Sequence, residues 1–136
     1  MDLQDYEDLP TYLASADVWD LTELTLRDSA GEDLELTFEK LFLVADQQWH
    51  SYEEPPERIR TVVRDWLLAH WQADSTEYLE RVMRVSFYWA LDKAFFRRAL
   101  DAYRGDKAEY ERLLEVSPGD HIDPWHSLRA LPPFKP

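Results

Sequence analysis

The sequence predicts a mainly α-helical protein: one compact domain built around a long central helix from about residue 75 to 104. Three observations predict it. Residues 75–104 contain no Gly and no Pro, and apolar side chains recur along them in steps of three and four. Segments with helix-start signals flank this run on both sides. The 136-residue chain is also 45% hydrophobic, which is enough for a single domain to bury a core.

The segment before residue 50 has two readings. Residues 21–38 alternate apolar and polar side chains on both sides of Gly31, which predicts a small β-hairpin followed by a helix over 39–50. The alternative is one helix from about Glu32, started by Ser29. In that alternative four apolar residues fall at helical spacing: Leu34, Phe38, Leu41 and Ala45.

The second half of the chain carries clearer helix signals. Two prolines and an apolar stripe predict a helix over about 57–72. Asp74 is the expected N-cap of the central helix, Gly105 its end, and Asp106 the cap of a further short helix. Five of the eight prolines lie in residues 117–136, which predicts an irregular, Pro-rich C-terminal tail. Four apolar residues predict that this tail packs on the body: Trp125, Leu128, Leu131 and Phe134.

Asp92 stands out in the predicted central helix because it occupies an inward-facing step between Trp89 and Phe96. A carboxylate at such a position needs a cation or a hydrogen-bond donor. Two roles are open. In a structural role, Asp92 could pair with an arginine from a neighbouring helix or, together with Lys93, open the seam to water. In a functional role, it could act as a general acid or base.

Charge is divided unequally along the chain. Residues 1–57 hold sixteen acids and two bases, a net charge of −14, whereas residues 58–136 hold thirteen bases and twelve acids. We therefore divide the single domain, 1–136, into an acidic half (1–57), a helical core (58–116) and the tail. A field of that size repels itself, and its confinement to one half indicates recognition of a basic partner.

Several classes of function are excluded by what the sequence lacks. There is no cysteine, and three glycines cannot build a phosphate-binding loop. The chain has no surplus of Lys and Arg to neutralise nucleic-acid phosphates. The longest strictly apolar run, Leu41–Ala45, is too short to cross a membrane, and the acidic start is unlike a signal peptide. These observations predict a cytoplasmic protein.

The leading hypothesis is an acidic protein-binding module that neutralises or sequesters a basic protein, such as a nuclease or another toxin. A bacterial immunity protein, an antitoxin or an inhibitor that imitates DNA would fit this charge. We expect no enzymatic activity, no cofactor and no metal. Aromatic anchors beside the charge are expected to supply affinity, with Trp19 as a further candidate that core packing competes for. The predicted partner-binding residues are Asp17, Asp20, Glu23, Asp28, Glu32, Asp33, Glu35, Trp49, Tyr52, Glu53 and Glu54.

Two alternatives belong to other classes. The first is a helical accessory or scaffold subunit, homodimeric through the apolar faces of the central helix, whose acidity serves solubility. The second is a small metal-dependent enzyme. Its ligands would come from one short segment rich in imidazole and carboxylate groups, namely Asp120, His121, Asp123 and His126.

Overall fold

The computed structural model describes the chain except residues 11, 52, 73–74 and 117–136, and the side chains of residues 49–51, 113–114 and 116. The part of the chain described holds seven α-helices, one short 3-10 turn and no strand, so the mainly α-helical prediction is confirmed. The elements are α1 (Leu3–Glu7), α2 (Ser15–Asp28), η1 (Ser29–Gly31), α3 (Leu34–Ser51), α4 (Glu57–Ala69), α5 (Thr76–Tyr88), α6 (Lys93–Ala102) and α7 (Ala108–Val116).

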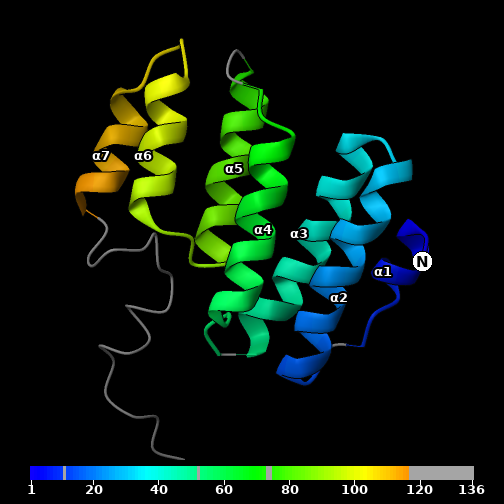
Figure 1. Ribbon diagram of the computed structural model, residues 1–136. Coiled ribbons are helices and arrows are strands. Elements are labelled where there is room, and N and C mark those ends of the chain that lie inside the picture. The colour runs from blue at the N-terminus through cyan, green and yellow to red at the C-terminus, as the bar shows by residue number, and fades with distance from the viewer. Residues whose placement is uncertain (11, 52, 73–74, 117–136) are drawn as a thin grey trace, which may run out of the picture.

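The helices stand side by side in chain order, and neighbours along the chain run in opposite directions (Figure 1). α2 and α3 form one antiparallel pair, α4 and α5 a second, and α6 and α7 a third at the far end. α2 packs on α4 and α3 packs on α5, while α1 lies against α3. The acidic half of the sequence, α1–α3, therefore occupies one end of the stack.

An aromatic cluster joins α3, α4 and α5 at the centre of the stack. The ring of Phe38 meets the ring of Trp66 edge-on at 5.3 Å and that of Tyr78 at 5.8 Å. The Tyr78 hydroxyl donates a 2.7 Å hydrogen bond to the Leu67 carbonyl oxygen, which ties α5 to α4. Burial raises the pKa of the Tyr78 phenol, so this donor keeps its proton.

The predicted β-hairpin near 21–38 is wrong. Those residues form the end of α2, the turn η1 and the start of α3. Two of the threonines that suggested strands instead donate to the backbone one helical turn earlier: Thr22 to the Val18 carbonyl at 2.8 Å, and Thr25 to that of Leu21 at 2.7 Å. The helix alternative was nearer to the structure.

The long central helix over 75–104 is also wrong, because the chain breaks it into α5 and α6. α5 ends at Tyr88, and Ala90 takes a positive φ of 52°. The Leu91 N–H then donates to the Ser86 carbonyl at 3.0 Å, the bond pattern of a Schellman helix end. Glycine is the usual residue at this turn, so its absence hid the break.

Other predictions of helix bounds meet mixed outcomes. The helix expected over 57–72 appears as α4, and a short helix follows Asp106 as α7. The N-cap of α5 is Ser75, whose hydroxyl accepts from the Tyr78 N–H at 3.1 Å, while the predicted cap Asp74 lies outside the described residues. The predicted Pro-rich tail, 117–136, also lies outside them.

Candidate functional site

One of the predicted partner-binding acids is used inside the fold. Glu32 pairs with Lys40, whose side chain is only 2% exposed. The same amine donates to the Met1 carbonyl oxygen at 3.1 Å and lies 5.5 Å from the centre of the Tyr6 ring. Because a buried ammonium needs a counter-charge, Glu32 serves the packing of α1 on α3. It is not available to a partner.

Two more predicted acids join the acidic end of the stack to its middle. Glu23 of α2 pairs with Arg58 of α4, and Glu35 of α3 pairs with Arg81 of α5 at 2.9 Å. Glu35 is 63% exposed, so its pair adds little stability. Both pairs nevertheless neutralise part of the acidic charge with arginines from the second half of the chain.

Three predicted acids stay in water together. Asp17, Asp20 and Asp28 are exposed, and the structure shows no ion pair to any of them among the residues it describes. Their spacing of three and eight places them on one side of α2, with the half-buried Leu24 between them. We call these three carboxylates the α2 stripe. They are the part of the predicted site that the fold brings together.

The remaining predicted site residues lie elsewhere. Asp33 is exposed and accepts from the Glu35 N–H at 3.4 Å, at the start of α3. Glu53 and Glu54 are exposed in the segment between α3 and α4. The Trp49 side chain and Tyr52 lie outside the described residues.

Of the aromatic anchors, Trp19 belongs to the core, since only 8% of it is exposed. Sequence reasoning missed Tyr12, which is 75% exposed and lies three residues before α2 begins. The signal for it was its place in the sequence: Tyr12 lies between Pro10 and the first residue of α2, outside the described helices.

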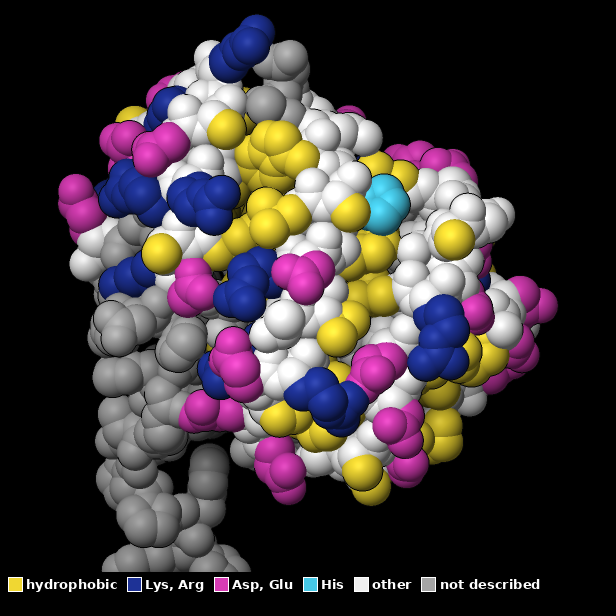
Figure 2. All heavy atoms as spheres, viewed as in Figure 1, with side chains coloured by type: hydrophobic (Ala, Val, Ile, Leu, Met, Phe, Trp, Pro, Cys, Tyr) yellow, Lys and Arg dark blue, Asp and Glu magenta, His cyan; other side chains and the backbone are white. Residues whose placement is uncertain are grey.

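The opposite end of the stack has a different surface. Figure 2 shows acidic side chains along the edge that α1–α3 form, and Lys and Arg side chains gathered over the α6 end. Arg97 and Arg98 are both exposed on α6. The molecule is therefore strongly acidic at one end and mixed in charge at the other.

Asp92 has a structural role at the α5–α6 break. Its carboxylate accepts from the Phe95 N–H at 2.6 Å, which makes it the N-cap of α6. Arg64 of α4 donates to the other carboxylate oxygen at 3.1 Å. The first of the two roles considered for Asp92 accounts for these contacts.

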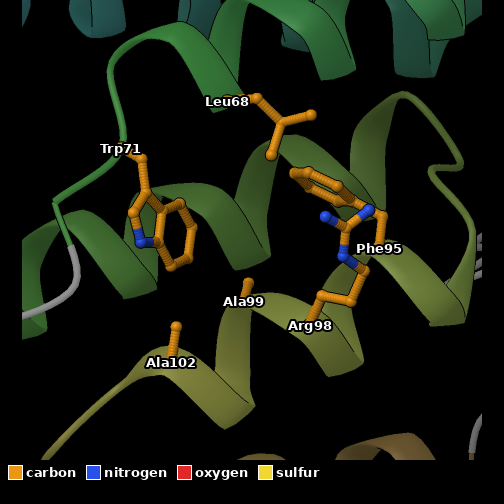
Figure 3. A pocket seen from close by; sticks show the side chains of 6 residues that line it. All are labelled: Leu68, Trp71, Phe95, Arg98, Ala99 and Ala102. Carbon is orange, nitrogen blue, oxygen red and sulfur yellow. The ribbon is translucent and has the colours of Figure 1, made fainter.

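An apolar cleft of about 280 Å³ opens between the C-terminal end of α4 and α6. Figure 3 shows Leu68 and Trp71 on one side of it, Ala99 and Ala102 on α6, and the Arg98 guanidinium beside the Phe95 ring. Leu68 is 44% exposed, and the Trp71 ring is held edge-on to Tyr78 at 5.8 Å. Sequence reasoning missed this cleft, although Leu68 falls outside the buried stripe of its helix.

Metal binding and membrane crossing find no support in the described residues. Among them, no three His, Asp or Glu side chains come close enough together to hold a metal ion. The segment Asp120–His126, on which the metal hypothesis was based, lies outside them. None of the helices seen in the structure combines the length and the hydropathy that crossing a bilayer requires.

Comparisons with protein-family models, with curated proteins and with solved structures find no match to this chain.

Proposed function

We propose that this protein is an acidic binding module that recognises a basic protein through the α2 stripe. The support is the selective way in which the fold uses its acids. Glu23, Glu32 and Glu35 are spent on contacts within the molecule, whereas the α2 stripe is left exposed at the acidic end of the stack. Clustered carboxylates raise the encounter rate with a cationic partner by about 10- to 1,000-fold.

The observation that carries the proposal is the position of Asp28. It is the last residue of α2, where the helix dipole is negative and a carboxylate is unfavourable. No ion pair to a described residue offsets this cost. A charge held in water against the helix dipole does not serve the stability of the helix, which favours a role in binding.

Tyr12 supplies the second requirement of an interface. Charge mainly steers association, and affinity comes from a few buried aromatic or arginine side chains. Tyr12 is exposed just before α2, and a partner bound to the α2 stripe would bury it as such an anchor. A cationic nuclease-like toxin remains the partner class that suits an immunity protein, antitoxin or inhibitor of this charge, and the cytoplasm remains the predicted compartment.

The test compares two variants of equal charge. One replaces the α2 stripe with amides (Asp17→Asn, Asp20→Asn, Asp28→Asn), and the other replaces three exposed acids of α7 (Glu109→Gln, Glu111→Gln, Glu115→Gln). Immobilised wild-type protein and both variants are exposed to host extract at 50 and 200 mM salt, and the retained proteins are identified by mass spectrometry.

We expect a cationic protein that wild type and the α7 variant retain in dilute buffer and that the α2 variant loses, with affinity about tenfold or more weaker. Equal losses in the two variants would mean that only net charge matters. Retention by all three at both salt concentrations would reject the proposal.

A second candidate, a helical accessory subunit, is favoured by the apolar cleft beside α6. An apolar interface there would be indifferent to salt, whereas binding through the α2 stripe weakens steeply between about 50 and 200 mM. The same experiment therefore separates the two functions.

A further inference from the structure

The cleft beside α6 combines apolar walls with one positive charge. Its walls are Leu68, Trp71 and Phe95, and its base is formed by the small side chains Ala99 and Ala102. Arg98 is the only charged residue among the described residues that line it. The matching ligand is thus a peptide segment that presents an aromatic side chain next to a carboxylate.

The last described helix, α7, packs on the helix that lines one side of this cleft. α7 runs antiparallel to α6, so the end of α7 lies beside the start of α6 (Figure 1). The ten residues of α6 span about 15 Å, and neighbouring helix axes lie about 8–10 Å apart. Nine extended residues reach about 30 Å, so the chain from residue 117 to 125 is long enough to enter the cleft.

The sequence of that segment contains the required combination. Trp125 is preceded by Asp120 and Asp123, whose charge is complementary to that of Arg98. The later apolar residues Leu128, Leu131 and Phe134 are instead accompanied by Arg129 and Lys135, which repel Arg98. Trp125 is also the largest apolar side chain after α7.

We propose that the cleft between α4 and α6 is a peptide-binding site whose occupant is this chain's own segment 117–136, with Trp125 in the cleft and Asp123 beside Arg98. The contact covers the apolar surface of Leu68 and Trp71. It takes the cleft out of use as an interface between subunits unless a competing peptide displaces the segment. The α2 stripe at the other end of the stack takes no part in it.

The absence of cysteine makes a direct test available in the full chain. Ala102→Cys places a thiol at the edge of the cleft, and His126→Cys places one next to the proposed anchor. A disulfide requires Cα atoms within about 7 Å, so its formation reports contact. The pair Asp20→Cys with His126→Cys is the control, because Asp20 lies at the acidic end, and circular dichroism verifies that each variant folds.

We expect mild oxidation to give an intramolecular disulfide in the 102/126 variant at least about tenfold faster than in the 20/126 control. Trp125→Ala should remove this difference, whereas Phe134→Ala should preserve it. Equal rates in the two pairs, or insensitivity to Trp125→Ala, would overturn the proposal. A disulfide formed only between two chains would also overturn it, and would assign the cleft to a second copy.

The charge of Arg98 provides an independent arm. Arg98→Glu should slow disulfide formation in the 102/126 variant, and Asp123→Arg in the same chain should restore it. If the reversal has no effect, or the second change does not restore the rate, the assignment of Trp125 as the anchor is wrong.

Discussion

The junction between α2 and α3 and the junction between α5 and α6 turn the chain in different ways. At the first, side chains hold the turn: the Ser29 hydroxyl donates to the Leu26 carbonyl at 2.6 Å and accepts from the Trp66 indole at 2.9 Å, while Glu32 meets the buried Lys40. At the second, the backbone makes the turn through the positive φ of Ala90, and Asp92 restarts the helix.

The difference shows which acidic side chains make contacts within the fold. At the first junction an acid completes a buried contact, so part of the charge read as a binding signal is structural. At the second an acid caps a helix and meets Arg64. The proposed function assigns to a partner the acids that neither a junction nor a salt bridge uses, the α2 stripe above all. Four predictions test this division, in order of decreasing effect.

Removal of Glu32 should have the largest effect on stability. Glu32→Ala leaves the buried amine of Lys40 without its counter-charge, and we expect unfolding to become easier by about 3 kcal/mol in chemical denaturation. Glu39→Ala, on an exposed position of α3, is the control and should change stability by less than about 0.5 kcal/mol. The double variant Glu32→Leu, Lys40→Met should recover most of the loss, because it removes both charges.

Asp92→Ala should cost about 1 to 2 kcal/mol of folding free energy, since α6 loses its N-cap and Arg64 loses its partner. Asp92→Asn separates the two contributions. Asparagine is an equally good N-cap, so Asp92→Asn should lose less than half as much folding free energy as Asp92→Ala. If both variants are equally destabilised, the contact with Arg64 outweighs the cap.

Ala90→Gly should stabilise the protein by up to about 1 kcal/mol, because glycine adopts a positive φ without steric cost. The matched change Ala94→Gly, at an exposed position in the first turn of α6, should destabilise by up to about 1 kcal/mol. The midpoint temperatures of thermal unfolding should therefore shift in opposite directions, upward for Ala90→Gly and downward for Ala94→Gly. A loss of stability in Ala90→Gly would show that packing of the buried methyl group outweighs the backbone strain.

The smallest effect is expected at Glu35 and Arg81. A double-mutant cycle with Glu35→Gln and Arg81→Gln should give a coupling of about 0.2–0.5 kcal/mol, which 0.5 M salt abolishes. A coupling above about 1 kcal/mol would mean that this bridge behaves as a buried ion pair, like that of Glu32 with Lys40, and not as a surface pair.

The helical class was predictable from the sequence because amphipathic spacing in α4 and α5 coincides with burial. Ile59, Val63, Trp66 and Leu67 of the predicted stripe are all buried. The α5–α6 break was not predictable from glycine or proline, since Ala90 takes the turn. Its signal was Asp92 itself, because an acid in the middle of an apolar stripe is also what a helix N-cap looks like.

The hairpin prediction failed for a different reason. Alternation of leucine and threonine suggested strands, yet a threonine whose hydroxyl bonds back to the helix can be buried. The site was predictable only in part. The exposed acids of α2 were among the predicted residues, but the sequence does not reveal that Lys40 would claim Glu32 from eight positions away.

Enclosure of Lys40 has a practical consequence for chemical labelling. It is the only lysine in the first 57 residues, and its amine sits beneath Met1 and Tyr6. Acylating reagents reach that nitrogen only when α1 detaches from α3. The labelling rate of Lys40 therefore measures how often the acidic end opens locally. Lys107, at the other end of the stack, would serve as the internal reference.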